Sequence, residues 1–544
     1  MKDVISMRDF SKEEILFILD TADEVKHAIH DKEYDNNTFK KKHNLSVKQL
    51  LNDTDIATLF LEKSTRTNYS FRSAATKAGA KVEGFTNPED TSLGKGETWA
   101  ATIEMFAGWG YNALVMRTTT EGIPRWSKQA IHKNHQHVKQ QHDSLHQPYS
   151  YHPPIILNGG DGTNQHPTQC FLDLMTIREI ARSQNQDLDN LNIALLNDLR
   201  YGRTNASLMS IAHHFNWKLH LAYPPRFGPQ QSRLDDLINN NVQVIDHGTD
   251  FMEAMTASLI AYQSRPQKER VAKGEDLITI ANLGRITLKM YEQMGNLAPY
   301  LLHPLPIDSK TFEEISHDLQ HHPKNFTKFQ AENGIYIRIA LLAIGLDKII
   351  SPYTQQEQNH THTTTTITQL PFSQKEKPLN NLRSGIIEHE GIVLDHIPAG
   401  YARRLAGILG LEQQNLPLVI SSYLTTPNGR QSHKDIIKIH TQYQFTQQQY
   451  EAISLIAPQT TISLISNGNV YQKIRPTLGT IITNRITCGN DQCVTNIKEE
   501  HVTPLHLVEQ NTTASYLRCD YCEQPDTIDK IYDDKRFKYI GEEK

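Results

Sequence analysis

Apolar and polar positions alternate along the first 350 residues between short apolar runs and longer amphipathic segments. The short runs occupy residues 55–61, 111–116, 154–157, 192–196, 218–223, 241–245 and 257–262. The first amphipathic segment begins at Ser11, and Glu14 completes a capping box with it. Alternating strands and helices predict doubly wound parallel sheets. Because one core seldom exceeds about 250–300 residues, we expect two such lobes.

The rest of the chain has a different pattern. Residues 351–380 are polar and rich in Thr and Gln, which predicts a linker. Beyond it, GIVLDHI, DIIKIHTQYQF and TTISLIS alternate with period two. This indicates an antiparallel sheet with helices on one side, an α+β domain, before a small β domain. The predicted domains are 1–165, 166–350, a linker at 351–380, 381–480 and 481–544.

Residues 132–152 interrupt the first pattern with six histidines among Gln, Lys and Ser. Histidines could form a metal site, but the segment has no Cys and shows no helical periodicity. We therefore expect a solvated surface loop.

Composition excludes several classes of function. Hydrophobic residues make up 38% of the chain, charged residues 22%, and the formal net charge is −5, so no strong field favours nucleic acid or membrane. No window of eighteen apolar residues occurs, and the N-terminus lacks a signal-peptide core. The expected location is the cytoplasm.

Four of the five cysteines form two close pairs near the C-terminus. Cys488 and Cys493 are followed, after 25 residues, by Cys519 and Cys522. Four thiolates suit tetrahedral Zn²⁺, and a site filled by four sulfurs has no open position, so we predict one structural zinc and no catalytic metal. Four unrelated cysteines in a small β domain are the alternative.

Polar residues follow the ends of the apolar runs. Ser64, Thr65, Arg66 and Thr67 come after the first run and precede a helix-like segment. Backbone N–H groups at such a helix start, with hydroxyls and a guanidinium, hold phosphate, although a simple helix cap would explain this string alone. Similar positions are taken by Arg117, His166, Gln169, Arg203, Arg265 and Gln267. Because ligands bind at the carboxyl ends of parallel strands, these residues predict a pocket for a poly-anion.

These motifs, in order, resemble the catalytic chain of aspartate carbamoyltransferases: STRT, SLGKGET (92–98), MRxxxEG, GDGxxQHPTQ, DLxYGRT, RxQKER and HPLP. The likeness covers about residues 1–350. In the second half, DHIPAG (395–400), HKDIIKI (433–439), APQTTISLI (457–465) and the four cysteines resemble the regulatory chain of the same enzyme. The sequence is thus similar to a natural fusion of the two chains.

The resemblance implies transfer of the carbamoyl group of carbamoyl phosphate to the amine of L-aspartate, a step of pyrimidine biosynthesis. The phosphate would be held by Ser64, Thr65, Arg66 and Thr67, and the carbonyl oxygen would be polarised by Thr67, Arg117 and His166. The carbamoyl NH₂ would donate to Gln169 and to the carbonyls of Leu305 and Pro306. The two carboxylates of aspartate would be held by Arg203, Arg265 and Gln267. The amine attacks, and the departing phosphate takes its proton, so no side-chain base is needed.

The resemblance also implies an assembly. Ser92 and Lys95 would reach the active site of a neighbouring subunit, which requires a homo-oligomer built on catalytic trimers. Regulatory dimers would bridge trimers into six fused chains, unless the linker prevents pairing and leaves a trimer.

The regulatory half would bind nucleotide effectors such as CTP, ATP or UTP. The matching positions are Asp395, His396, Lys434, Lys438, Ile465, Val470 and Lys473. Lys434 and Lys438 would share one side of a helix or of a strand. Without the resemblance, two solvated lysines would be the preferred explanation.

Some positions depart from the pattern and keep two alternatives open. Ile307 follows HPLP where an Arg is usual, and Ser463 and Gly468 stand where the best-known regulatory chain has Asn and Tyr. An ornithine carbamoyltransferase-like enzyme would share the phosphate loop, but it usually carries HCLP and an SMG element. A catalytically silent nucleotide-binding scaffold is supported only by Ile307.

Overall fold

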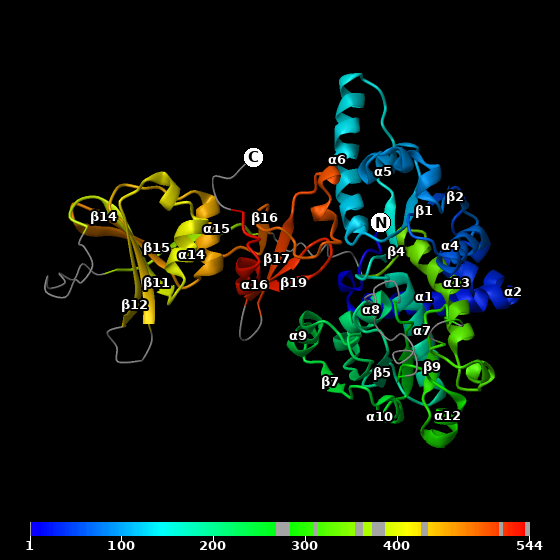
Figure 1. Ribbon diagram of the computed structural model, residues 1–544. Helices are drawn as coiled ribbons and strands as arrows, with labels where there is room; N and C mark the ends of the chain where they lie inside the picture. Colours follow the sequence, from blue (N-terminus) through cyan, green and yellow to red (C-terminus); the bar gives the residue numbers. More distant parts are fainter. Residues whose placement is uncertain are drawn as a thin grey trace. The chain divides into compact units, whose positions relative to one another are not determined.

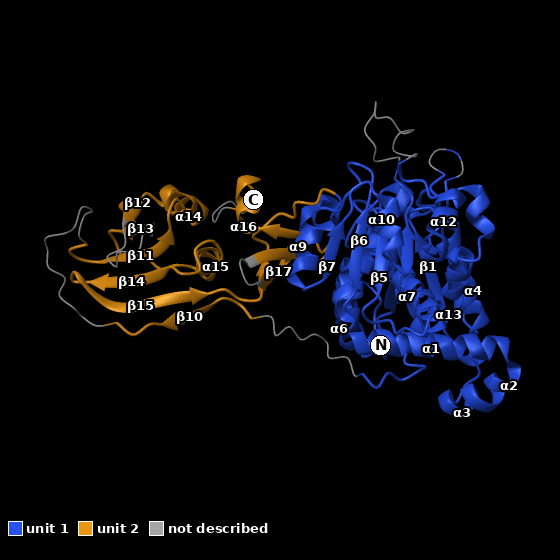
Figure 2. Cartoon of the chain, turned by 90° about the horizontal axis from the view of Figure 1, so that it is seen from below, with its two compact units in different colours: residues 1–355, 492–500 blue, residues 356–491, 501–544 orange. Residues whose placement is uncertain are grey.

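The computed structural model describes residues 2–267, 283–308, 310, 313–353, 363–372, 387–425, 433–510 and 515–538. It divides into two compact units (Figures 1 and 2). The first contains Met1–Gln355 together with Gln492–Glu500, and the second contains Gln356–Asp491 together with His501–Lys544.

The first unit contains two parallel sheets. One has the order β2-β1-β3-β4, built from Lys81–Phe85, Asp55–Phe60, Ala113–Thr118 and Ile155–Asp161. The other has the order β7-β6-β5-β8-β9, built from Gln243–Asp246, Lys218–Ala222, Asn192–Leu196, Ile260–Gln263 and Tyr300–Leu302. The two predicted parallel-sheet lobes are confirmed, and β2 is an edge strand that the apolar pattern did not reveal.

Helices connect the strands of the first unit. In the first lobe they are α1 (Lys12–His30), α2 (Lys32–Tyr34), α3 (Lys40–His43), α4 (Thr65–Lys77), α5 (Trp99–Gly108), α6 (Ile123–Ser144) and α7 (Pro167–Ser183). In the second they are α8 (Arg203–Ile211), α9 (Gln231–Asn239), α10 (Phe251–Thr256), α12 (Leu288–Met294) and α13 (Thr327–Gly345). The predicted capping box is present, because the Ser11 side chain accepts from the Glu14 amide and the Glu14 carboxylate accepts from that of Ser11.

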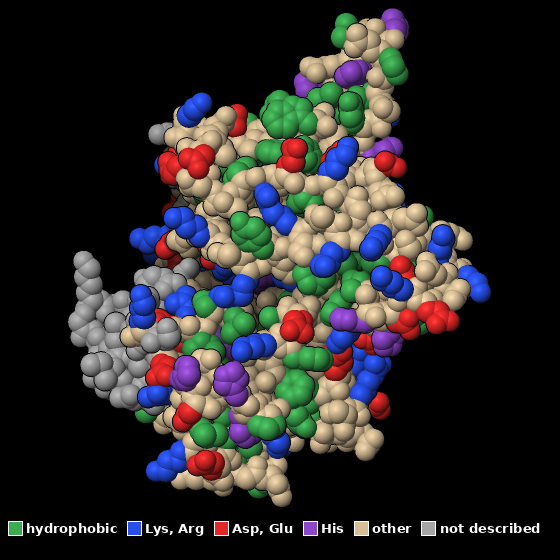
Figure 3. Space-filling view, turned by 90° about the vertical axis from the view of Figure 1, so that its right-hand side faces the viewer, with side chains coloured by type: hydrophobic (Ala, Val, Ile, Leu, Met, Phe, Trp, Pro, Cys, Tyr) green, Lys and Arg blue, Asp and Glu red, His purple; other side chains and the backbone are tan. Residues whose placement is uncertain are grey.

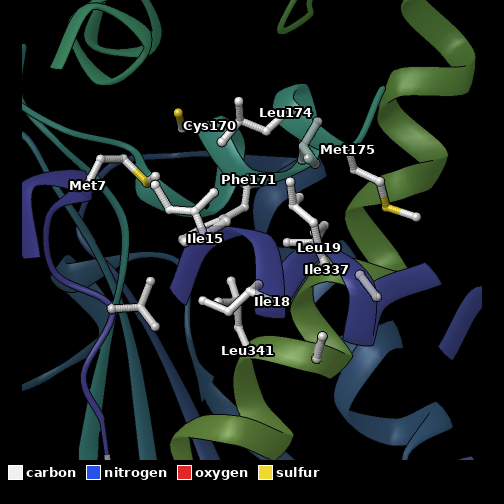
Figure 4. Packing of buried hydrophobic residues seen from close by; sticks show 14 of the residues in the cluster. Met7, Ile15, Ile18, Leu19, Cys170, Phe171, Leu174, Met175, Ile337 and Leu341 are labelled. Carbon is white, nitrogen blue, oxygen red and sulfur yellow. The ribbon is translucent and has the colours of Figure 1, made fainter. Parts of the chain in front are cut away.

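Both faces of each sheet are covered, as a doubly wound fold requires. Alternate residues of β1 divide between two sides: Ile56 and Phe60 join the main core cluster, whereas Ala57 and Leu59 are buried outside it. Helix α13 returns from the second lobe to pack on α1, α4 and α7. Figure 4 shows the centre of this cluster, formed by Met7, Ile15, Ile18, Leu19, Cys170, Phe171, Leu174, Met175, Ile337 and Leu341.

The histidine-rich segment is mostly helical, so the predicted loop is wrong up to residue 144. Helix α6 continues to Ser144, and the returning chain lays Tyr149 against it. The Tyr149 hydroxyl lies 3.0 Å from His135 Nδ1, and its ring is 5.0 Å from that of His142. Figure 3 shows this projection with histidines at its surface. Among the described residues, no His, Asp or Glu of this segment joins a group of three metal ligands.

The second unit begins with a six-stranded sheet of order β10-β15-β14-β11-β13-β12. Its strands are Thr366–Gln369, Asn469–Thr477, Thr461–Ser466, Gly391–Pro398, His433–Ile439 and Leu418–Thr425, all antiparallel. Helices α14 (Ala402–Ile408) and α15 (Gln447–Ile456) cover one face (Figure 2). The predicted α+β domain is therefore present. The range expected to be a linker contributes β10, which pairs with β15.

A small sheet completes the second unit. It has the order β16-β17-β18-β19, formed by Ile481–Thr483, Leu505–Gln510, Ser515–Cys519 and Pro525–Thr527, and the helix α16 (Ile528–Asp533) follows. No described helix is both long and apolar enough to cross a membrane.

Candidate active site

The polar run that follows β1 forms the start of a helix. Ser64 is the N-cap of α4, Thr65 and Arg66 are exposed in its first turn, and Thr67 is buried. The first amides of the helix and these side chains therefore stand together at the carboxyl end of β1. Burial lowers the pKa of Arg66 from its usual value, but the guanidinium remains charged. The arrangement is suited to a phosphate group.

A single carboxylate joins two of the predicted arginines. Glu62 Oε1 accepts from Arg117 Nη2 at 2.8 Å and from Arg203 Nη2 at 2.7 Å, and its Oε2 accepts from Arg203 Nη1 at 2.9 Å. Arg117 also donates to the Gly159 carbonyl at 3.0 Å. Burial raises the pKa of Glu62, but Arg203 and Arg117 outweigh this and hold it below the usual value. Burial and the Arg203 charge lower the pKa of Arg117 to about 9, so this guanidinium is still charged at neutral pH.

The close approach of these arginines depends on a glycine. Gly160 has a φ of +114°, and a Cβ there would lie 3.0 Å from Arg117 Nη1 and 3.2 Å from Arg203 Cζ. Any side chain would therefore push the two guanidiniums away from the end of β4.

His166 lies at the start of α7 in the same charged surroundings. Burial lowers its pKa well below the usual value, and Arg117, Arg203 and Arg338 lower it further. The imidazole is consequently neutral at physiological pH. Its Nδ1 is buried and has no hydrogen-bond partner among the described residues. A neutral ring can donate one hydrogen bond to a developing oxyanion without acting as an acid.

Gln169 and the HPLP loop are linked through a buried network. Gln169 Nε2 donates to Asp173 at 2.8 Å, and Gln330 Nε2 donates to the same oxygen at 2.6 Å. Burial raises the pKa of Asp173 to about 7, although these donors oppose the rise. Gln330 in turn accepts from the His303 amide at 2.8 Å.

The loop after β9 is fixed by its own histidine and a buried glutamate. The Leu305 amide donates to His303 Nδ1 at 2.8 Å, and His303 Nε2 lies 3.1 Å from Glu314. The Leu305–Pro306 peptide is cis. Ile307, the departure noted in the sequence, is partly buried against the apolar cluster of the second lobe. Ile307 therefore contributes to apolar packing and does not supply the positive charge that an Arg would supply at this position.

The end of β8 reaches the loop that carries Arg203. The Gln267 amide donates to Asp198 at 3.0 Å, and Gln267 Nε2 donates to the Tyr201 carbonyl at 2.7 Å. Arg265 is partly buried just before it. The structure thus places Arg117, Arg203 and His166 in one group, and Thr67 lies with Arg117 beside Gly159. Gln169 and the Leu305 loop form a second group, and Gln267 and the Arg203 loop form a third.

Ser92 and Lys95 belong to none of these three groups. Both are exposed in a short 3-10 helix, Ser92–Lys95, that precedes α5, and no contact joins them to the residues above. This position leaves them accessible to another subunit.

The start of α5 is held by the segment Gln492–Glu500. The Glu500 carboxylate accepts from the Trp99 amide at 2.6 Å and from the Ala100 amide at 3.1 Å. The same segment pairs with Glu121, whose amide donates to the Gln492 carbonyl at 2.8 Å. The Glu121 side chain accepts from the Thr163 amide at 2.9 Å in the loop before His166. One short segment therefore supports two elements that build the site.

The four C-terminal cysteines come together as predicted. Their Sγ atoms lie within 4.8 Å of one another, and all four residues are buried. Cys488 and Cys522 sulfurs are 3.5 Å apart, far beyond an S–S bond of about 2.05 Å. The Thr495 hydroxyl donates to Cys493 Sγ at 3.2 Å, as an ionised thiolate would favour. The donor set fits a tetrahedral metal.

The predicted effector residues lie on neighbouring strands. Lys438 of β13, Val393 of β11, Ser463 of β14 and Lys473 of β15 are in register across the sheet. They face away from the helices, because the alternate residues Leu394, Ile437 and Ile462 form the core.

The other effector candidates stand on the same strands. Lys434 pairs with Asp395, and His396 contacts Thr461 at 3.2 Å. Burial lowers the pKa of His396, and the charges of Lys434, Lys473 and Arg475 add to this effect. Ile465 and Val470 are partners in the β14–β15 pairing. A cationic surface of this kind suits a phosphate-bearing ligand.

Sequence reasoning missed Glu62 and Asp173. Both had a visible signal: Glu62 stands two residues before Ser64, and Asp173 is a lone acid in the apolar run CFLDLM, four residues after Gln169. On a helix that spacing brings two side chains to one face.

An open α/β sheet pair with guanidiniums at the strand ends, and with a neutral histidine among them, is the arrangement expected of a transferase of the carbamoyltransferase class. Comparison with known sequences agrees. The aspartate/ornithine carbamoyltransferase pattern matches residues 2–179 with its carbamoyl-P binding domain and residues 189–344 with its Asp/Orn binding domain. The aspartate carbamoyltransferase regulatory chain matches 386–477 with its allosteric domain and 480–532 with its metal binding domain.

Comparison with individual proteins shows which carbamoyltransferases this chain resembles. The aspartate carbamoyltransferase catalytic subunit of Bacteroides thetaiotaomicron is 34% identical over 345 residues, 63% of this chain and 94% of that protein. The Treponema denticola protein named Protein PyrBI is 27% identical over 509 residues, 89% of this chain and 91% of that one. Among solved structures, the catalytic subunit of M. jannaschii aspartate transcarbamoylase aligns with a TM-score of 0.51 and 29% identity, over 64% of this chain and 98% of that one.

The chain belongs to the aspartate carbamoyltransferase family and joins a catalytic-chain region to a regulatory-chain region. It is an enzyme that transfers a carbamoyl group to aspartate.

Glu62→Gln tests the bridge between the arginines. A neutral amide must turn one N–H toward a guanidinium, and the two cations then repel each other. We expect kcat/KM for aspartate to fall about 10- to 100-fold, the loss that follows removal of a charge-assisted hydrogen bond. The matched control is Glu332→Gln, an exposed glutamate of α13. Steady-state kinetics that left both variants within threefold of the parent would contradict this role.

Glu500→Gln tests the support of α5. Loss of a carboxylate at a helix start costs about 1 kcal/mol, so the Trp99 and Ala100 amides should exchange with deuterium roughly fivefold faster. The control is the exposed neighbour Glu499→Gln, which should leave the rate unchanged. Hydrogen-exchange mass spectrometry of peptides spanning α5 makes the comparison, and equal rates in the two variants would refute the cap.

Proposed function

We propose that the end of β1, the Arg117–Glu62–Arg203 bridge and the Gln169 network form one active site for the transfer of the carbamoyl group. The observation that carries the proposal is the bridge, because it fixes two charged guanidiniums, one from each lobe, on the same carboxylate. Phosphate binds at the start of α4 through Ser64, Thr65, Arg66 and Thr67.

The chemistry follows from the charges of these residues. Thr67, Arg117 and the neutral His166 polarise the carbonyl oxygen of carbamoyl phosphate and stabilise the negative charge that grows on it. The neutral amine of aspartate attacks the carbonyl carbon, the new C–N bond forms, and the C–O bond to phosphate breaks. The leaving phosphate accepts the amine proton, so the site supplies orientation and charge rather than a base.

The second substrate is selected by charge. Arg203, Arg265 and Gln267 stand on the strand ends of the second lobe and bind the two carboxylates of aspartate. Glu62 accepts from both Nη atoms of Arg203 and from Nη2 of Arg117, and Arg117 Nη1 donates to the Gly159 carbonyl. Arg117 Nε has no hydrogen-bond partner among the described residues and is left for a ligand. The packed Ile307 adds no charge, so the arginines named here carry the recognition.

Ser92 and Lys95 act in a neighbouring copy, so the active form is a catalytic trimer. Their exposure supports this assignment. Regulatory domains of two trimers pair and give six fused chains. The enzyme works in the cytoplasm.

Zn²⁺ occupies the cysteine cluster and is held by Cys488, Cys493, Cys519 and Cys522. Four sulfur ligands leave no position for substrate, and the ion stabilises the small β domain.

Nucleotides such as CTP, ATP and UTP bind the helix-free face of the regulatory sheet. Lys438 and Lys473 lie in register there, and Lys434, Asp395 and His396 stand at one end. The support is the cationic surface and the match of this sheet to an allosteric domain.

The direct test offers carbamoyl phosphate with aspartate or with ornithine, each with and without a nucleotide. We expect N-carbamoyl-L-aspartate and phosphate in equal amounts, and no carbamoyl-ornithine, by mass spectrometry. A nucleotide effect on the rate supports the regulatory assignment. Product from ornithine, or none from aspartate, would overturn the proposed selection by Arg203 and Arg265.

Metal analysis tests the zinc site. The purified chain should contain one zinc per chain by inductively coupled plasma mass spectrometry, and the double variant Cys519→Ser/Cys522→Ser should contain none. The control Cys170→Ser changes the buried cysteine of α7 and should retain the metal. A different metal in the parent protein would overturn the assignment to zinc.

A further inference from the structure

Asp173 is a buried acid whose place in the site the proposed mechanism does not explain. Its side chain is fully excluded from solvent in the apolar run of α7. Oδ1 accepts from Gln169 Nε2 at 2.8 Å and from Gln330 Nε2 at 2.6 Å, and Oδ2 accepts from the Tyr262 hydroxyl at 2.8 Å. Burial of a carboxyl group without such donors would be strongly unfavourable. Every oxygen of the group is therefore engaged.

The donors connect Asp173 to both sets of groups expected around the carbamoyl nitrogen. Gln169 is one of them, one helical turn before Asp173 on α7. Gln330 of α13 leads to the other, because its Oε1 accepts from the His303 amide at 2.8 Å and His303 Nδ1 accepts from the Leu305 amide at 2.8 Å. The carboxyl group thus stands between Gln169 and the loop that carries the carbonyls of Leu305 and Pro306.

The chemistry of the partners decides what this contact does. The Oδ1 atom of Asp173 accepts hydrogen bonds from both glutamines, whereas a glutamine amide has a donating end and an accepting end. A bond from Nε2 to Asp173 therefore turns Oε1 of Gln169 away from Asp173. The NH₂ of a carbamoyl group offers donors only, so the group that binds it must present an oxygen. A flipped Gln169 would present an N–H instead and would repel it.

We propose that Asp173 is a positioning residue that fixes the amide orientation of Gln169 and so makes the site selective for an acyl group that carries an NH₂. The proposal rests on the proposed function and on the contact between Gln169 and the carbamoyl nitrogen that the family resemblance implies. It adds a residue that touches no substrate but determines which end of a substrate-binding amide faces the ligand.

The test compares two ligands that differ only at that nitrogen. Acetyl phosphate has a methyl group where carbamoyl phosphate has NH₂, so its binding does not depend on the Gln169 oxygen. In Asp173→Leu, which retains the side-chain bulk but no acceptor, we expect carbamoyl phosphate to bind about 10- to 50-fold more weakly by calorimetry, since a buried hydrogen-bonding group loses its partner. Acetyl phosphate should change less than threefold. A purely structural defect would weaken both ligands equally.

Two further variants test whether the hydrogen bond between Asp173 and Gln169 accounts for the preference. Asp173→Asn keeps an oxygen toward the two glutamines and can donate from Nδ2 to the Tyr262 oxygen, so it should restore the preference for carbamoyl phosphate. Tyr262→Phe removes one donor but leaves the bond to Gln169, so it should also retain the preference. Asp173→Ala replaces the leucine variant if circular dichroism shows that the latter does not fold.

Gln169→Leu separates the failure of this inference from the failure of the proposed contact. If Gln169→Leu weakens both phosphates alike, Gln169 does not bind the carbamoyl nitrogen and the proposed contact is wrong. If Gln169→Leu is selective but the folded Asp173 truncation weakens both ligands equally or neither, the positioning role of Asp173 is wrong. Selective loss in both variants, with recovery in Asp173→Asn, is the result we expect.

Discussion

The catalytic unit depends on one carboxylate that holds two positively charged guanidiniums close together despite their mutual repulsion and partial burial. Arg117 and Arg203 come from different lobes and meet at one carboxylate, Glu62, through three hydrogen bonds of 2.7–2.9 Å. Two guanidiniums that donate to the same carboxylate oxygen lie close to each other, and without that carboxylate they would repel each other in a partly buried site. The carboxylate removes that repulsion while Gly160 leaves room for both side chains. The two lobes are thereby joined at the proposed substrate site.

The same principle extends outward from the bridge. Burial, and after it the charges of Arg117 and Arg203, lower the pKa of His166 and keep the ring neutral, so in the proposed mechanism the ring donates a hydrogen bond and does not act as an acid. Asp173 and Glu314 are carboxyl groups that the proposed mechanism does not use directly: Asp173 accepts from Gln330 of α13, and Glu314 lies beside His303 in the loop after β9.

Much of this fold could be read from the sequence, because the strand and helix signals are local. The apolar runs at 55–61 and 192–196 became β1 and β5 within one residue, and the residues after them became helix starts. The cysteine spacing identified the metal-ligand cluster for the same reason.

The features that were not predicted from the sequence depend on tertiary contacts. Helix α6 has a polar outer half whose periodicity gives no signal, and it is completed by Tyr149 returning from the following segment. Strand β10 forms because it can pair with the edge of β15, and the composition of a Thr- and Gln-rich segment gives no sign of this pairing. Glu62 and Asp173 escaped notice because an acid in a pocket for anions has meaning only once the arginines and amides that surround it are known.

The most direct test of this account is calorimetric titration with one molecule that joins a phosphonate to the amine of aspartate, so that both halves of the site are filled at once. The account predicts tight binding to the parent enzyme and a loss of at least about 100-fold in Arg203→Ala, because that change removes a bidentate guanidinium and leaves Glu62 partly unpaired. Unchanged affinity in Arg203→Ala would contradict the claim that the bridged arginines form the substrate site.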